Sequence, residues 1–300
     1  MLKIWMCGRT EKYDRFGGKR VESKWIEQMR GGPLTRARAR RSSQAVSDVG
    51  RVAFINTDDD PAWQDQMRLF EKALNLPTNV VWDEYKIFQR EKPDVAALGR
   101  KYTAVVVCGS HFNVSDAHHW LLDLFDLIKL SASLPNIRLL GVCFGCQAVA
   151  AALGGSVGPN ECGSYVYRNE QVHLTPVLQQ ALSHSCCIGN PPPASLNLLA
   201  THGQSVHKLP DSGQVLAWSN GSPHELFVCG EHENIIGCQC HPEYTPSILR
   251  EKLNDPLHKA GVLSAEALAK AEASFELETG SPMINALLRS FLVGSIELGY

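Results

Sequence analysis

The segment GVCFGCQ, residues 141–147, constrains the fold of this chain more than any other. It joins IRLLGVC, an apolar run typical of a buried strand, to FGCQAVAAALGG, a run of small residues typical of a helix closed by glycines. Cys143 stands at the junction, between Gly141 and Gly145. A sharp strand-to-helix turn needs small neighbours because its backbone is crowded, and it exposes the side chain at its tip. The helix that follows presents its positive end to the sulfur, which favours a reactive thiolate.

Strands and helices alternate around this turn. The pattern predicts strands over 51–57, 79–88, 102–110 and 137–143. Helices are expected between them over 61–74, 115–133 and 144–155, with Ser115 as the N-cap of the second. Such alternation predicts an α/β fold with a mostly parallel sheet, helices on both faces, and ligands at the carboxyl ends of the strands. After residue 155, short strands and turns predict a small antiparallel β portion, followed by helices from residue 245 onwards.

The distribution of charge sets residues 1–50 apart from the rest. They contain 12 Lys or Arg and 5 Asp or Glu, whereas the whole chain contains 29 and 31. Residues 31–50 are rich in Gly, Arg and Ser and cannot bury enough apolar surface to fold on their own. We interpret residues 1–50 as a basic, partly flexible N-terminal extension, 51–250 as a catalytic domain, and 251–300 as C-terminal helices packed on that domain. A basic docking arm or nucleic-acid arm is the alternative for the extension.

The cysteine content points to a reducing compartment. Ten cysteines could form disulfides, but a chain of 300 residues can build its own core and its start lacks the apolar stretch of a secretory signal. No apolar run approaches the ~18 residues that a membrane span needs. The net charge of −2 gives no electrostatic reason to expect nucleic acid or an acidic membrane. We therefore expect a cytoplasmic protein without nucleic-acid or membrane partners.

A second motif, QCHPEY at residues 239–244, supplies what a reactive thiolate needs. A cysteine nucleophile requires a base, and that base requires a group that orients it. His241 follows the predicted strand NIIGCQC, and Glu243 stands two residues on, across Pro242. Glu243 can therefore hold the imidazole in one tautomer and stabilise its charged form.

Together the two motifs resemble a known family. GVCFGCQ followed about 95 residues later by CHPE closely resembles the class I glutamine amidotransferases, whose pattern is G-x-C-x-G-x-Q and then H-P-E. The resemblance covers roughly residues 51–250 and implies a three-layer, flavodoxin-like sheet fold. It also implies that Cys143 is the nucleophile, His241 the general base and Glu243 its partner.

The resemblance implies further site residues. The oxyanion hole of the family uses the backbone N–H after the cysteine, here Phe144, and one from the loop after an earlier strand. That loop matches CGSHF, so Gly109 or Ser110 is the second donor. Gln147 matches the residue that helps to hold the glutamyl portion of the substrate.

The segment THGQSVHKLP, residues 201–210, resembles the stretch that the family carries between the two motifs, usually S-H-G-D-x-V followed by L-P. This match implies that His202 and Gly203 lie near the substrate, although a purely structural role for His202 is about as plausible. Gln204 stands where the family usually has an acid.

The GSHFNVSDAHHW segment and the helical tail look most like a stand-alone, GMP-synthase-like branch that includes the plant γ-glutamyl peptidases. About 50 residues follow residue 250, where GMP synthetases attach a synthetase domain. The resemblance implies hydrolysis of a γ-glutamyl amide through a γ-glutamyl thioester. The substrate is then a small molecule such as glutamine or a glutathione-like compound, and neither metal nor cofactor is required.

Several alternatives stay open. The chain could be a glutaminase subunit that delivers ammonia to a separate synthase, or a non-catalytic binding protein on the same fold. Cys143 and Cys146 form a C-x-x-C that could be a redox pair, or half of a zinc site completed by Cys238, Cys240 and His241, but the glycine frame and the H-P-E motif explain these residues better. A reversible inhibitory disulfide between Cys143 and Cys146 is a further hypothesis. The related flavodoxin-like peptidases place a histidine directly after the nucleophile, where this chain has Phe144.

Overall fold

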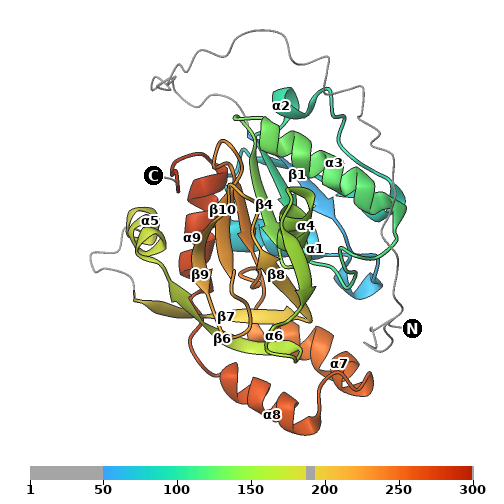
Figure 1. Cartoon of the computed structure of the whole chain (residues 1–300), viewed down its shortest axis with the longest axis vertical. Helices are drawn as coiled ribbons and strands as arrows, with labels where there is room; N and C mark the ends of the chain where they lie inside the picture. The colour runs from blue at the N-terminus through green and yellow to red at the C-terminus, as the bar shows by residue number, and fades with distance from the viewer. Residues whose placement is uncertain (1–49, 187–192, 299–300) are drawn as a thin grey trace. The chain divides into compact units, whose positions relative to one another are not determined.

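The computed structural model describes residues 50–186 and 193–298, so the expected N-terminal extension lies outside the described residues except for Gly50. A large sheet runs through this part of the chain, with helices on both of its sides (Figure 1). The longer helices are α1 (Gln66–Leu74), α3 (His119–Ser133), α4 (Phe144–Ala152), α5 (Pro176–Cys186), α8 (Ala265–Ser274) and α9 (Ser281–Leu292). The short ones are α2 (Leu98–Lys101), α6 (Pro246–Leu249) and α7 (Asp255–Lys259).

The main sheet has a parallel half and an antiparallel half. Its strands, in order across the sheet, are β2 (Val81–Lys86), β1 (Arg51–Asn56), β3 (Ala104–Val107), β4 (Arg138–Val142), β11 (Ile235–Cys238), β10 (Leu226–Cys229), β9 (Gln214–Trp218), β6 (Val166–Leu174) and β7 (Ser195–His202). Neighbours from β2 to β11 pair in parallel, and neighbours from β11 to β7 pair antiparallel. A separate two-stranded sheet joins β5 (Ser156–Pro159) to β8 (Gln204–Lys208).

Side chains along the central strands point alternately to the two faces of the sheet and so divide the core into two layers. Val52 and Phe54 of β1 point to the layer that also contains apolar side chains of α1, α5 and α9. Ala53 and Ile55 point the other way, to the layer formed with α3 and α4. Both faces of these strands are buried, which is why they read as continuous apolar runs rather than as alternating ones. The predicted α/β fold, with a parallel sheet and helices on both faces, is confirmed. The antiparallel portion is larger than predicted, because β10, β9, β6 and β7 extend the same sheet.

A third apolar cluster lies beyond the sheet, where α6, α7 and α8 pack on the outer strands. Tyr167 of β6 and Leu199 of β7 join Leu249, Leu257 and Phe275 there. Thr245 caps α6 by accepting from the N–H of Ile248 at 3.4 Å. This cluster also includes Tyr244, and it therefore connects the helical segment after residue 245 to the H-P-E motif.

The topology brings the predicted site to one edge of the sheet. β1, β3, β4 and β11 run parallel, so their carboxyl ends lie at the same edge. Thr57, Gly109, Cys143 and His241 each follow one of these ends within a few residues. Parallel sheets bind ligands at this edge.

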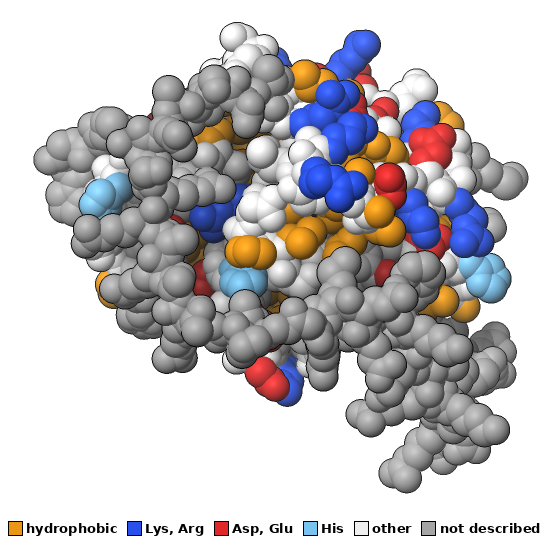
Figure 2. Space-filling model, turned by 90° about the horizontal axis from the view of Figure 1, so that it is seen from above, with side chains coloured by type: hydrophobic (Ala, Val, Ile, Leu, Met, Phe, Trp, Pro, Cys, Tyr) orange, Lys and Arg blue, Asp and Glu red, His pale blue; other side chains and the backbone are white. Residues whose placement is uncertain are grey.

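None of the described helices is both long and apolar enough to cross a lipid bilayer. Figure 2 shows one face of the molecule on which Lys and Arg side chains gather, with acidic side chains beside some of them. Several basic groups of the described chain pair with acids, as Arg51 does with Asp83 and Lys92 with Asp123, each at 2.7 Å.

Candidate active site

Cys143 occupies the turn between β4 and α4 that the sequence predicts. Its backbone adopts φ 51° and ψ −109°, a left-handed conformation that non-glycine residues rarely take. Such a conformation costs about 1–3 kcal/mol and persists only where the surroundings enforce it. Here its N–H donates to the Cys238 carbonyl at 2.7 Å, and its own carbonyl accepts from the N–H groups of Cys146 and Gln147. The turn is therefore fixed from β11 on one side and from α4 on the other.

The two glycines that flank the cysteine are required by close backbone contacts. A Cβ on Gly141 would lie 2.5 Å from the carbonyl oxygen of Gly145. A Cβ on Gly145 would lie 2.3 Å from the carbonyl oxygen of Val107, at the end of β3. The first turn of α4 thus lies directly against the ends of β3 and β4, and only glycine fits at either position.

His241 and Glu243 are held just after β11. The N–H of His241 donates to the Leu199 carbonyl at 2.7 Å, and the Pro242 carbonyl accepts from the amide of Asn285 on α9 at 2.9 Å. His241 Nδ1 lies 2.7 Å from Glu243 Oε1, and both side chains are buried. The structure therefore brings together the base and the orienting acid that the sequence suggests.

This pairing sets the tautomer of the imidazole. A carboxylate only accepts, so Nδ1 carries the proton and Nε2 keeps a lone pair. Nε2 of His241 is buried and has no hydrogen-bond partner among the described residues. Burial alone would lower the pKa of His241, but the charges of Glu243 and then of Cys143 raise it well above its usual value. The imidazole is thus suited to accept a proton and to keep it beside a thiolate.

The side chains of Cys143 and His241 both lie close to Gly109. A Cβ placed on Gly109 would lie 3.0 Å from His241 Cε1 and 3.6 Å from Cys143 Cβ. The Cys143 thiol donates a long hydrogen bond, 3.7 Å, to the Thr201 carbonyl at the end of β7. The cysteine side chain is 6 % exposed. The nucleophile and the base predicted from sequence thus pack on the same glycine.

The predicted oxyanion donors surround this contact. Thr57 ties the loop after β3 in place, because its hydroxyl donates to the Gly109 carbonyl at 3.0 Å and its carbonyl accepts from the Ser110 hydroxyl at 2.7 Å. Phe144 is the first residue of α4, and the first N–H groups of a helix lack an intrahelical acceptor. In the described chain the backbone N–H groups of Phe144, Gly109 and Ser110 make no hydrogen bond. Their role as oxyanion donors stays a prediction.

Gln147 lies one turn after the cysteine, but its amide is already engaged. Nε2 donates to the Gln204 carbonyl at 2.8 Å and to Gln239 Oε1 at 3.2 Å. The Cys146 thiol also donates to Gln239 Oε1, at 3.6 Å, and burial raises the pKa of Cys146 well above its usual value. Gln147 therefore links α4 to β8 and to the residue that follows β11, and its contact with substrate stays a prediction.

His202 sits in a network that fixes its protonation. Asn160 Nδ2 donates to the carbonyls of Ser164 and His202, so Asn160 Oδ1 is an acceptor. His202 Nδ1 lies 2.9 Å from that oxygen and 3.1 Å from the Gln204 carbonyl, so it carries the proton. Burial lowers the pKa of His202 to about 3, which leaves Nε2 as a buried acceptor without a partner in the described chain. Gly203 lies against the Tyr165 ring, which a Cβ would approach to 3.2 Å.

Three residues near this site were missed by sequence reasoning. Thr201 supplies the carbonyl next to the Cys143 thiol, and Tyr244 stacks on the His241 ring. Glu225 is fully buried close to α4. Tyr244 could have been found, because it follows the H-P-E motif directly, whereas Glu225 directly precedes an ordinary apolar strand and gives no signal.

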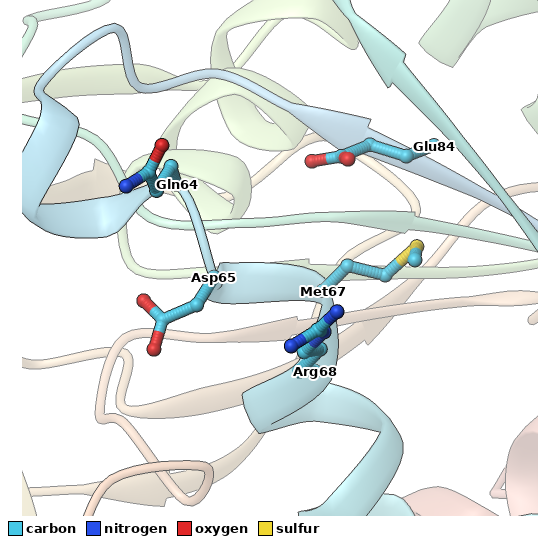
Figure 3. Close-up of a pocket in the computed structure, with 5 residues that line it drawn as sticks. All are labelled: Gln64, Asp65, Met67, Arg68 and Glu84. Atoms are coloured by element: carbon cyan, nitrogen blue, oxygen red, sulfur yellow. The ribbon is translucent and has the colours of Figure 1, made fainter.

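A hollow of about 430 Å³ lies elsewhere, between the start of α1 and strand β2 (Figure 3). It is lined by Gln64, Asp65, Met67, Arg68 and Glu84, and no predicted site residue lines it. In Figure 3 the Glu84 side chain lies across from Met67 and Arg68, and the carboxylate of Asp65 points away from them. Its lining brings together no nucleophile and base, so we assign it no chemistry.

Asp58, Asp59 and His111 bring potential metal ligands within 4.8 Å of one another. Hydrogen bonds within the loops already explain this arrangement. Asp58 accepts from the N–H of His111 at 3.0 Å and of Asp60 at 2.9 Å, and it lies 2.9 Å from His111 Nδ1. The metal-free mechanism expected from the sequence stays a prediction.

Comparison with known proteins places this geometry in a family context. The family model for glutamine amidotransferase class-I matches residues 71–259. Gamma-glutamyl peptidase 4 of Arabidopsis thaliana is 31 % identical over 173 residues, covering 56 % of this chain and 64 % of that protein. Gamma-glutamyl peptidase 2 of the same plant is 27 % identical over 255 residues, covering 83 % and 98 %. A glutamine-hydrolyzing GMP synthase of Streptococcus mutans is 31 % identical over 134 residues, covering 43 % and 24 %.

Among solved structures, a glutamine amidotransferase from Thermotoga maritima superposes with a TM-score of 0.60. It shares 21 % sequence identity, and the match covers 82 % of this chain and 99 % of that one. This likeness concerns the fold, while the family match spans more than half of the chain. The chain belongs to the class I glutamine amidotransferase family.

Proposed function

We propose that this protein is a cysteine hydrolase that cleaves γ-glutamyl amide bonds, with Cys143 as nucleophile, His241 as general base and Glu243 as its orienting partner. The observation that carries the proposal is the packing of Cys143 and His241 on Gly109, with His241 Nδ1 bonded to Glu243 and Nε2 left without a partner among the described residues. The peptidase relatives favour a protein that acts alone on a small γ-glutamyl compound. The cytoplasmic location expected from the thiols stays a prediction.

The proposed reaction has two halves. His241 Nε2 takes the thiol proton, or already holds it in an ion pair with the thiolate, as Cys143 Sγ attacks the γ-carbonyl carbon and a C–S bond forms. The backbone N–H groups of Phe144 and Gly109 or Ser110 stabilise the oxyanion; each such donor typically contributes ~3–4 kcal/mol. The C–N bond then breaks as His241 gives its proton to the leaving amine, and a γ-glutamyl thioester remains.

Water completes the cycle. His241, neutral again, removes a proton from a water molecule that attacks the thioester carbonyl. The C–S bond breaks, the thiolate recovers the proton from His241, and the glutamyl product leaves with a free γ-carboxyl group, which loses its proton to solvent. Glu243 keeps its hydrogen bond to His241 Nδ1 throughout and so holds the imidazole in the productive tautomer.

Release of glutamate from glutamine, glutathione and γ-glutamyl dipeptides tests the proposal. The unmodified protein should release glutamate from at least one of these compounds, and Cys143→Ala should release none. Cys162→Ala removes an exposed thiol and is the matched control, which should keep the activity. Activity that survives in Cys143→Ala would refute the assignment of the nucleophile.

Delivery of ammonia to a separate synthase is the second candidate, because a GMP synthase is among the relatives. Glutaminase activity that rises only when a synthase is added would favour it. The third reading, a non-catalytic binding protein, makes a different prediction. In that case the glutamine-like electrophile 6-diazo-5-oxo-norleucine should fail to label Cys143.

A further inference from the structure

One segment of the chain contacts two separate parts of the proposed site. Residues 57–65 connect β1 to α1 and include a short 3-10 helix, Pro61–Trp63. We call this segment the β1–α1 loop. Its first residues bind the loop after β3, which bears two of the predicted oxyanion donors, and its last residues pack beside the rings that cover His241. The proposed mechanism assigns no role to this segment.

The start of the β1–α1 loop fixes the loop after β3. The Thr57 hydroxyl donates to the Gly109 carbonyl, and the Thr57 carbonyl accepts from the Ser110 hydroxyl. Asp58 accepts from the N–H of His111 at 3.0 Å. Thr57 and Asp58 are both buried, so these bonds are shielded from water. The position of Gly109 and Ser110 therefore depends on the β1–α1 loop.

The end of the β1–α1 loop supports the ring of the proposed base. Trp63 is buried and stacks on Tyr244, with ring centroids 5.1 Å apart and ring planes 26° apart. Tyr244 in turn covers the His241 imidazole. The short helix holds Trp63 in place, because its N–H donates to the Asp60 carbonyl at 2.9 Å and the Asp60 side chain accepts from the N–H of Ala62. The plane of the imidazole thus depends on Trp63 through Tyr244.

Lys252 fastens the β1–α1 loop from the opposite side. Its Nζ donates to the Ala62 carbonyl and to Asp65 Oδ1, each at 2.7 Å, and lies 4.8 Å from the centroid of the Trp63 ring. A cation at this distance from an indole is attracted to it, and more strongly where water is excluded. The Lys252 side chain is only 18 % exposed. One ammonium group therefore binds the backbone, a carboxylate and a ring of the same loop.

Lys252 lies in an unusual stretch of helix. Residues Arg250–Asn254, between α6 and α7, form a π-helical turn. Such turns are rare and often occur at functional sites. Arg250 pairs with Glu272 of α8 at 2.6 Å, which ties the turn to the C-terminal helices. The turn thus carries Lys252 to the Trp63 ring from a fixed support.

We propose that Trp63 and Lys252 are positioning residues for the proposed reaction. Lys252 holds the β1–α1 loop, and this loop sets the plane of the His241 ring together with the place of the loop after β3. The inference rests on the proposed function and adds to it two residues that act through others: Trp63 acts through Tyr244, and Lys252 acts through Trp63 and Ala62.

Steady-state kinetics tests the role of Trp63, on whichever of glutamine, glutathione or a γ-glutamyl dipeptide the unmodified protein cleaves. Trp63→Leu should lower kcat about tenfold and change KM less than about twofold, because a small displacement of the base impairs the chemistry more than binding. Trp63→Phe keeps a ring and should retain most of kcat. Trp218→Leu is the matched control, since that ring is 43 % exposed, and it should change neither constant.

The same measurement tests Lys252. Lys252→Met keeps an apolar stem but loses the charge, and it should lower kcat about three- to tenfold with little change in KM. Lys252→Arg keeps a cation and should restore most of kcat. Lys259→Met removes a lysine that is 76 % exposed and pairs with Asp255, and it should have no effect.

The reactivity of Cys143 provides a measurement that needs no substrate. Iodoacetamide attacks the thiolate, which at pH 6 depends on a proton held by a well-placed His241. Alkylation of Cys143, followed by mass spectrometry of the labelled peptide, should slow about tenfold at pH 6 in Trp63→Leu and differ less than about twofold at pH 9. A merely structural role would change the fraction of protein that reacts and leave the pH dependence as it is.

The outcomes separate this inference from the proposed function. Unchanged kcat and unchanged alkylation at pH 6 in Trp63→Leu would overturn the inference and leave the hydrolase function standing. If the unmodified protein cleaves none of the compounds, the proposed function fails, and alkylation at pH 6 decides the inference alone. If Trp63→Leu does not fold, Lys252→Met decides by the same two measurements.

Discussion

The phenol ring of Tyr244 lies flat on the imidazole of His241, with ring centroids 4.3 Å apart and ring planes 7° apart. Trp63 in turn stacks on Tyr244, with ring centroids 5.1 Å apart, and Lys252 Nζ lies 4.8 Å from the centroid of the Trp63 ring. These contacts form a column that begins at the proposed base. Glu243 fixes one edge of the imidazole and Tyr244 fixes its plane, so the two together leave the ring little freedom.

Removal of the stacking ring should impair the chemistry more than substrate binding. We expect Tyr244→Leu to lower kcat about 10- to 100-fold with little change in KM, because a slight tilt of the imidazole misaligns Nε2 with the thiol. Tyr244→Phe keeps the ring and should restore most of kcat. Steady-state kinetics on glutamine or glutathione measures both constants. If Tyr244→Phe and Tyr244→Leu are equally impaired, the hydroxyl group of Tyr244 matters rather than its ring, and the proposed positioning role of the ring is wrong.

Loss of the orienting acid should change both rate and pH dependence. Glu243→Gln should lower kcat about 10³- to 10⁴-fold, because the amide can select the wrong tautomer of His241. The folded-state pKa of His241 is raised, so the stability that its charge contributes is present in full below its usual value of 6.5 and is lost as pH rises through the raised pKa. Thermal unfolding between pH 6 and pH 9 should therefore show a smaller pH dependence in Glu243→Gln than in the unmodified protein. An identical pH dependence would contradict this view of His241.

Gly109 should tolerate no side chain. In Gly109→Ala the new methyl group would lie 3.0 Å from His241 Cε1 and 3.6 Å from Cys143 Cβ, so the side chain of Cys143 or of His241 must move. We expect kcat to fall at least about tenfold, since a displacement of an ångström can cost about 100-fold. Gly99→Ala is the control, because its Cβ meets atoms no nearer than 3.4 Å. Full activity of Gly109→Ala, with a normal thermal unfolding curve, would show that the contact is not critical.

The sequence predicts what short-range patterns encode. The apolar runs of the central strands and the glycines at 141 and 145 follow from packing rules, and the structure places them as expected. The helix start at Ser115 was wrong: α3 begins at His119, and Asp116 instead accepts from the N–H of Asn113 within a turn. A capping residue and a turn residue look alike in sequence, because both use a short polar side chain to bind backbone N–H groups.

The parts of the site that the sequence does not reveal depend on long-range contacts. Gln147 occupies the position that the family motif indicates, yet its amide binds Gln204 and Gln239, which no local pattern foretells. In the sequence, Glu225 looks like one more residue of a predicted strand. Only the pairing of β10 with β11 brings it opposite Gln239 and close to α4.

Glu225 should reduce the stability of the protein at neutral and alkaline pH. Burial raises the pKa of Glu225 from an ordinary 4.5 to about 7. The negative charge of Glu170 also raises this pKa, whereas the positive charges of Arg168 and His241 lower it. A raised carboxyl pKa contributes stability that is present below pH 4.5 and is lost as pH rises through about 7. Such a shift corresponds to about 3 kcal/mol.

Glu225→Gln removes this ionisation and keeps the shape of the side chain. We expect the variant to gain up to about 3 kcal/mol over the unmodified protein between pH 5 and pH 8, measured as the difference in unfolding free energy from urea titrations at each pH. Glu231→Gln should show no such pH-dependent gain, because its carboxyl group is exposed. A Glu225→Gln variant that is less stable at every pH would show instead that Glu225 is a structural residue.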